Sequence, residues 1–114
     1  MLTVPDKGLL LSMIAHCDRI EEKIKGVTKE EFSENQDIKE IVCFHLLQIG
    51  ELAGKYGKEF LKDYSGVPWG KMRGMRNRIV HGYGTIKVER VWATANKDIK
   101  PLREYCERIL RENK

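Results

Sequence analysis

The residues best suited to chemistry lie between positions 72 and 84. This stretch, MRGMRNRIVHGYG, contains three arginines, a histidine and a tyrosine, and Arg76 and His81 stand five positions apart. Histidine can accept and donate a proton near neutral pH, whereas arginine stays charged and can hold two phosphate oxygens at once. Asn77, one turn before His81, could orient the imidazole ring by a hydrogen bond. These residue types suit cleavage of RNA by its own 2′-hydroxyl, because histidine can move the proton while arginine stabilises charge on phosphorus.

A plainer interpretation is a solvated basic helix end, with His81 near the C-terminus, where the helix dipole favours it. Residue types and spacing alone favour this interpretation over catalysis, since short motifs often mislead. Each residue of an ideal helix turns the chain by about 100°, so Arg76 and His81 point about 140° apart. They can converge only if the arginine curls, if the helix loosens at Gly82, or if a second copy of the chain completes the site.

The elements that position these residues are predicted to be helices. Apolar residues recur at spacings of three and four, and no segment shows sustained two-residue alternation. We expect an all-α, antiparallel up-and-down bundle of four to five helices that forms a single domain over residues 1–114. The expected helices cover residues 4–25, about 34–57, 68–81 and 87 onward, with a single turn near 28–31 and a short helix or loop at 58–66. Pro101 is expected to kink or divide the last helix.

Composition sets limits on the partners and the compartment. The 114 residues carry a formal charge of +4 and a pI of about 9.0, which is compatible with a nucleic-acid partner without establishing one. Cys17, Cys43 and Cys106 form no CxxC pair, so we expect buried thiols in a reducing cytoplasm and neither a zinc site nor disulfides. No apolar run approaches the roughly 20 residues of a membrane span, and no secretory signal is evident. A cytoplasmic protein without a membrane segment, metal or cofactor is therefore expected.

The central stretch also resembles a known family. Residues 76–83, RNRIVHGY, resemble the signature of HEPN-domain proteins of the HepT-like toxin family: arginine, four residues, histidine, one residue, tyrosine. The resemblance extends over nearly the whole chain. Residues 84–87, GTIK, depart from it, because the family pattern has an aromatic and then an acidic residue in this region. The further matching segments are Ile49-Gly50-Glu51, Val67-Pro68-Trp69, Gly74-Met75 and Val91-Trp92.

This resemblance implies a helical homodimer in which two motifs face each other across a cleft. Arg76 and His81 would be the catalytic residues of a metal-independent endoribonuclease, the toxin of a type II or type VII toxin–antitoxin system. The implied partner is a nucleotidyltransferase (MntA-like) antitoxin that transfers AMP to Tyr83, giving O-AMP-tyrosine. Such an anionic group would occupy the phosphate site and repel RNA. The alternative is a non-catalytic HEPN module that binds a nucleotide or a nucleotidyltransferase.

Several other residues have a structural and a functional interpretation. Glu51 is suspected of orienting Arg76 or Arg73, although a solvated helix charge is equally consistent with its position. Arg73 is expected to bind the RNA backbone, because it shares a stripe with Asn77 and His81 at a spacing of four. Arg78 could bind RNA or belong to the soluble surface. His45 is expected in the core or an interface, and His16, without polar neighbours, is expected to be structural or exposed. Trp69 and Trp92 are expected to be core anchors.

Overall fold

The computed structural model describes residues 2–82, 84 and 86–113. This part of the chain is helical and contains no strand, which confirms the all-α prediction. None of its helices combines the length and the apolarity needed to cross a membrane. The helices are α1 (Val4–Ile24), α2 (Lys29–Glu34), α3 (Gln36–Ala53), α4 (Lys58–Asp63), α5 (Trp69–Gly82), α6 (Val88–Lys97) and α7 (Ile99–Glu112).

The starts of α1 and α2 are determined by local sequence. At α1, the Thr3 hydroxyl accepts a hydrogen bond from the Asp6 amide at 3.1 Å, and the Asp6 carboxylate accepts one from the Thr3 amide at 3.3 Å. Thr28 and Glu31 form the same reciprocal pair at the start of α2. Each pair satisfies two amides that have no partner inside the helix. The helices begin at Val4 and Lys29, close to the starts at residues 4 and 28 expected from the sequence.

The end of α3 differs from the prediction. The helix stops at Ala53 with Gly54 as its C-cap, whereas the apolar pattern extended it to residue 57. Tyr56 falls within the predicted helix and is buried, but it lies outside α3 and stacks on Phe60 of α4 with ring centroids 4.0 Å apart. Aromatic packing against a short neighbouring helix therefore explains the buried tyrosine, and the helical periodicity is fortuitous there.

The predicted division of the last helix is confirmed, but its position was wrong. The break falls at Asp98, between α6 and α7, three residues before Pro101. Pro101 is the third residue of α7, in the first turn, where a backbone N–H has no partner inside the helix. Proline is tolerated at such a position because its missing N–H costs nothing there.

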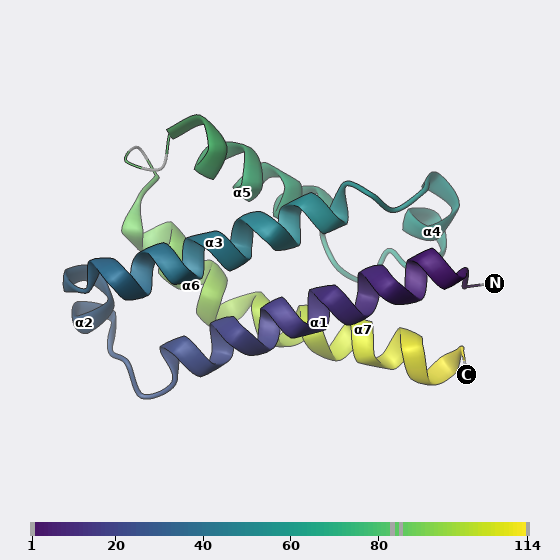
Figure 1. Ribbon diagram of the computed structural model, residues 1–114, viewed down its shortest axis with the longest axis horizontal. Helices are drawn as coiled ribbons and strands as arrows, with labels where there is room; N and C mark the ends of the chain where they lie inside the picture. Colours follow the sequence, from purple (N-terminus) through teal and green to yellow (C-terminus); the bar gives the residue numbers. More distant parts are fainter. Residues whose placement is uncertain (1, 83, 85, 114) are drawn as a thin grey trace.

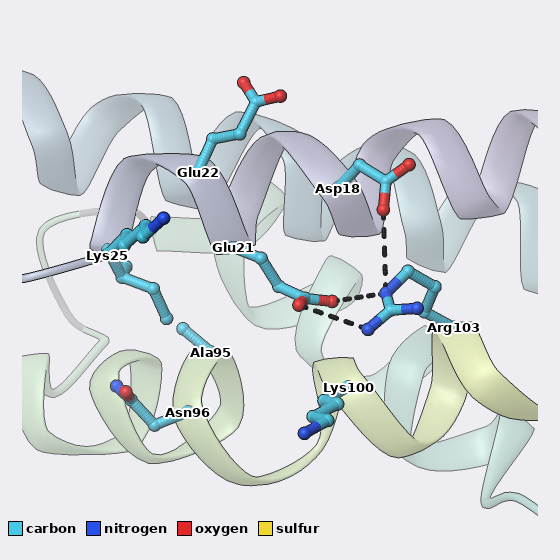
Figure 2. Close-up of a pocket in the computed structure, with 9 residues that line it drawn as sticks. Asp18, Glu21, Glu22, Lys25, Ala95, Asn96, Lys100 and Arg103 are labelled. Carbon is cyan, nitrogen blue, oxygen red and sulfur yellow. Dashed lines mark hydrogen bonds and ion pairs between the residues drawn. The ribbon is translucent and has the colours of Figure 1, made fainter.

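The long helices form an antiparallel up-and-down arrangement (Figure 1). Helix α1 packs between α3 and α7, and α5 packs on the far side of α3. The register of α1 against α7 is marked by Arg103, whose Nε lies 2.6 Å from Oε1 of Glu21 and 3.5 Å from Oδ1 of Asp18 (Figure 2). Chain segments at opposite ends of the sequence therefore close the bundle.

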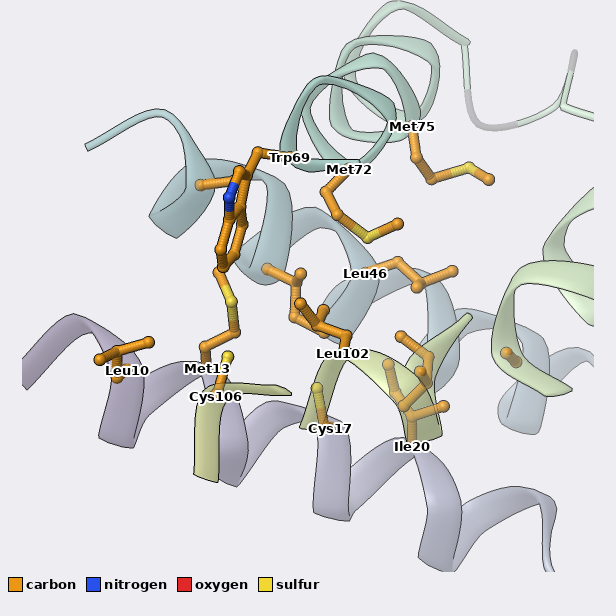
Figure 3. Close-up of a cluster of buried hydrophobic side chains, with 14 of the residues drawn as sticks. Leu10, Met13, Cys17, Ile20, Leu46, Trp69, Met72, Met75, Leu102 and Cys106 are labelled. Carbon is orange, nitrogen blue, oxygen red and sulfur yellow. The ribbon is translucent and has the colours of Figure 1, made fainter. Parts of the chain in front are cut away.

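The core is apolar and is built from all four long helices. Met13 and Cys17 of α1 belong to one buried cluster with Leu46 of α3, Met72 of α5 and Leu102 of α7 (Figure 3), and each is at most 3% exposed. Burial of apolar surface on this scale is the main force that stabilises the bundle.

The cysteines are free and buried, as the sequence predicted. Burial raises the pKa of the Cys43 thiol to about 11 and that of Cys106 to about 12. The reactive thiolate is therefore scarce at neutral pH.

Candidate functional site

The candidate site is carried by α5, whose apolar stripe fixes the direction of its polar residues. Met72, Met75 and Ile79 are buried against the core. Arg76 is consequently half-buried beside α3, whereas His81 is exposed in the last turn. The chain remains helical through Gly82, so the separation of about 140° between Arg76 and His81 persists. A single copy of this chain does not bring the two side chains together.

Gly50 allows α3 and α5 to approach closely at the position of Arg76. A Cβ atom on Gly50 would lie 2.6 Å from the Met72 carbonyl oxygen and closer still to the Arg76 side chain. Real Cβ atoms do not occur at such distances, so only glycine permits this approach without displacing a helix. Because Glu51 follows directly, the close approach also brings a carboxylate within reach of α5.

The Arg76 guanidinium is held by two neighbours. Its Nε donates a short hydrogen bond to Oε1 of Glu51, and its Nη1 donates one to Oδ1 of Asn77 at 2.9 Å. The sequence left open whether Glu51 serves Arg76 or Arg73, and in the structure it binds Arg76. The predicted bond from Asn77 to His81 is not found among the described residues, and Asn77 accepts from Arg76 instead. Arg76 therefore has a fixed position on the surface.

Arg73 is not part of this cluster. Arg73 is exposed, and its Nε lies beside the C-terminal end of α3, at 3.4 Å from where a Cβ on Gly54 would be. Eight residues separate it from His81, which is about 12 Å along the helix axis. Its role in binding the RNA backbone stays a prediction. Tyr83, the expected modification site, lies outside the described residues.

Arg76 and His81 lie outside the three hollows of similar size on the described surface. Each of these hollows has a volume of about 600 Å³. No group of three or more His, Cys, Asp or Glu side chains among the described residues could hold a metal ion. Of the two proposed catalytic residues, Arg76 is half-buried and His81 is exposed.

The structure also joins two histidines that the sequence treated separately. His16 of α1 and His45 of α3 face each other with their Nδ1 atoms 2.9 Å apart, so the expectation that His16 lacks polar neighbours was wrong. One ring must donate and the other accept, since two protonated rings would repel each other. Burial lowers the pKa of both imidazoles, and the charges of His16 and Arg19 lower that of His45 further. His45 is buried, as predicted.

The structure also places the two tryptophans and Arg78, which the sequence analysis considered. Trp69 is 6% exposed, and its indole N–H donates to the Tyr64 carbonyl at 2.6 Å, as expected of a core anchor. Trp92 is half-buried, with its ring centroid 5.0 Å from that of Phe32. Arg78 is exposed on the side of α5 that faces α6.

An antiparallel helical bundle that carries the Arg-x4-His motif at the end of one helix is a protein of HEPN type. More narrowly, the chain belongs to the family described as Ribonuclease HepT-like, which it matches over residues 13–109.

Curated relatives are consistent with this membership. A protein of Caldanaerobacter subterraneus subsp. tengcongensis named "Putative RNase" is 29% identical over 102 residues, which cover 90% of this chain and 91% of the relative. A "Putative RNase" of Methanocaldococcus jannaschii is 30% identical over 106 residues, covering 93% and 91% respectively. A "Probable ribonuclease HepT" of Thermococcus cleftensis is 28% identical over 103 residues, covering 90% and 94%. No solved structure matches the chain significantly.

Proposed function

We propose that the protein is a metal-independent endoribonuclease that acts as the toxin of a toxin–antitoxin pair. The observation that carries this proposal is the fixed guanidinium of Arg76, held by Glu51 and Asn77 on the same helix as an exposed His81. A positively charged group with a fixed direction can stabilise a phosphorane without reorganising during the reaction. The exposed imidazole can exchange protons with a substrate.

The proposed reaction uses the RNA's own 2′-hydroxyl. A histidine removes the 2′-proton, the 2′-oxygen forms a bond to phosphorus, and the bond from phosphorus to the 5′-oxygen breaks. A second proton donor protonates the departing 5′-oxygen, which leaves a 2′,3′-cyclic phosphate and a 5′-hydroxyl. Arg76 stabilises the charge on the phosphoryl oxygens throughout. Arginine and histidine supply every step, so no metal ion is needed.

The complete site is proposed to form across a homodimer. Arg76 and His81 diverge by about 140° on one straight helix, and no hollow of the single chain described above contains them. A second copy that presents its own α5 would bring a histidine to the arginine of the first. Two His81 residues in one cleft could then serve as base and acid.

The direct test is RNA cleavage in the presence of EDTA. Wild-type protein is expected to cleave, and His81→Ala should lose about 100- to 10,000-fold in rate, the usual contribution of a general acid or base. Val80→Ala is the matched control, because Val80 is an exposed neighbour on the same helix at 51% exposure. Equal cleavage by wild type and His81→Ala would refute the catalytic assignment. A wild type that binds its partner without cleaving RNA would favour a non-catalytic module.

Mixing two inactive variants tests the shared site. Arg76→Ala and His81→Ala chains, unfolded together and refolded as a mixture, give about half heterodimers. Each heterodimer retains one intact pairing of Arg76 from one chain with His81 from the other. Activity above that of either variant alone is expected, with about a quarter of wild-type activity as the upper limit, because each heterodimer retains only one of the two His81 residues. No recovery, with heterodimers demonstrated by native mass spectrometry, would contradict this pairing between chains.

The proposed partner is a nucleotidyltransferase antitoxin that transfers AMP to Tyr83. Intact mass after co-expression with the neighbouring gene should reveal a species heavier by one AMP that is absent from Tyr83→Phe. An unmodified protein held inactive in a stable complex would instead favour inhibition by binding alone.

A further inference from the structure

A second cationic feature lies on the opposite flank of α5 from Arg76. A hollow of about 600 Å³ runs between α5 and α6. Its walls carry four cationic side chains and one carboxylate, and small residues contribute much of its lining. These lining residues are the cations Lys71, Arg78, Arg90 and Lys97, the acid Asp98, and the small residues Gly70, Gly74 and Ala93.

The single carboxylate does not neutralise this groove. Asp98 already accepts from the Lys71 ammonium at 2.8 Å. Arg78, Arg90 and Lys97 are exposed and have no ion-pair partner among residues 2–82, 84 and 86–113. Three unneutralised cations around one hollow repel each other, so their arrangement suits an anionic ligand.

Other hollows on the described surface differ in charge. The one between α1 and the α6–α7 junction is balanced, because its cations lie among acids and Arg103 is bound to Glu21 (Figure 2). The one beside α2 has only acidic charged side chains: Glu31, Glu34 and Asp37. The cationic excess is thus concentrated between α5 and α6 and does not simply follow the net charge of the chain.

The groove is aligned with His81. At about 100° per residue, Gly70, Gly74 and His81 point within an arc of about 40° on α5. Arg76 points outside that arc. The distance from Gly70 to His81 is about 16 Å along the helix axis, which matches about five nucleotides stacked at 3.4 Å each. A nucleic-acid strand lying over the glycines would therefore arrive at the histidine.

We infer that the groove between α5 and α6 binds the phosphodiester backbone of the RNA substrate and leads the strand to His81, an assignment that rests on the proposed ribonuclease function. No aromatic side chain lines the groove among the described residues, so it offers no platform for base stacking. Contacts to phosphate supply affinity without reading sequence. The groove accordingly determines how long an RNA must be to bind tightly. It does not select the base sequence of that RNA.

The test measures binding of a mixed-sequence 2′-O-methyl RNA, which cannot be cleaved because its 2′-oxygens carry no proton. Fluorescence anisotropy between 50 and 200 mM salt gives the affinity and its salt dependence. Each phosphate neutralised on a single strand contributes about 0.7 to the slope of log affinity against log salt. The double variant Arg78→Gln/Arg90→Gln should lower that slope by about 1.4. Its affinity at 50 mM salt should fall at least tenfold.

Two matched controls separate the groove from overall charge. Lys7→Gln/Arg111→Gln removes the same charge from exposed positions on α1 and α7, and it should bind like wild type. Gly74→Glu places a carboxylate in the groove, whereas Gly8→Glu places one on α1; a Cβ on either glycine meets nothing within 4 Å, so neither substitution strains the fold. Gly74→Glu should lose binding and Gly8→Glu should not. Equal binding by the two glycine variants would overturn the inference.

Two further outcomes distinguish this inference from the proposed function. Groove variants should raise KM for a long RNA. If wild type does not cleave that RNA, the ribonuclease proposal fails, whereas the binding result still decides the groove. If polyglutamate of equal charge binds as tightly and loses affinity in the same variants, the groove is a docking surface for acidic protein and the nucleic-acid assignment is overturned.

Discussion

Replacing Gly50 with alanine should separate α3 from α5 at the position of Arg76. The new Cβ would lie 2.6 Å from the Met72 carbonyl oxygen, whereas ordinary contacts begin at 3.4 Å. Helix α5 must therefore retreat by about 1 Å. Because the opposing atoms belong to the backbone and to the base of a side chain, a rotamer change cannot relieve the contact. Such overpacking costs about 1–3 kcal/mol, against a gain of about 1 kcal/mol from replacing glycine inside a helix.

Gly8→Ala is the matched control for this substitution. Gly8 lies inside α1, where a Cβ meets nothing within 4 Å, so alanine should give the helix-propensity gain alone. Urea unfolding followed by circular dichroism should find Gly50→Ala less stable than Gly8→Ala by about 1–3 kcal/mol. At about 4 °C per kcal/mol, the melting temperatures should differ by about 4–12 °C.

The same variant tests the link between packing and chemistry. A displacement of Arg76 by about 1 Å can reduce the rate of a positioned reaction by up to about 100-fold. RNA cleavage should therefore fall in Gly50→Ala at temperatures where the protein remains folded. Equal stability of Gly50→Ala and Gly8→Ala would refute the close approach of α3 and α5. A destabilised Gly50→Ala with full activity would separate that approach from the function of Arg76.

Three further substitutions probe other parts of the structure. Glu51→Gln should lower kcat for RNA cleavage about 10- to 100-fold with little change in KM, because the guanidinium of Arg76 loses its orienting carboxylate. The same variant should lose at most about 1 kcal/mol of stability, because the ion pair is more than a third exposed. Tyr56→Phe should raise the free energy of unfolding by about 1 kcal/mol, since the buried hydroxyl has no hydrogen-bond partner among the described residues; a loss of stability in thermal unfolding would contradict this. The His16–His45 contact should make the protein less stable below pH 6.5, because burial lowers both pKa values and the unfolded chain then binds more protons. Stability from urea unfolding should be constant well above pH 6.5 and should fall as the pH drops through that value; His45→Gln should flatten this dependence.

Helix content and helix starts were predictable because local chemistry determines them. The capping pairs at Thr3 and Thr28 are visible as residues three apart, and each satisfies its amides without tertiary help. The end of α3 was missed, since Tyr56 has the right spacing for a helix although its burial comes from Phe60. The position of the break near Pro101 was also missed, because proline in a first turn does not interrupt a helix.

The candidate site was predictable in its residue types and less so in its contacts. The spacing of Arg76 and His81 correctly gave their divergence on α5. Helical spacing could not predict which arginine Glu51 would bind, because that depends on how closely α3 approaches α5 at Gly50. The His16–His45 pair and the groove between α5 and α6 join residues distant in sequence. A Gly-x-x-x-Gly spacing at positions 70 and 74, beside basic residues, was the only local signal for the groove.

The pairing of α1 with α7 has a consequence for the order in which the chain folds. The Glu21–Arg103 bond joins residues 82 positions apart. Closing a loop of that length costs about 2 kcal/mol more entropy than closing one of about 10 residues. Helices that are neighbours in sequence can pair early, whereas the side chains of α1 that face α7 become buried only after α7 has formed. During synthesis the bundle therefore cannot close until α7 has left the ribosome, and chains that stop before α7 should expose Cys17 to thiol reagents.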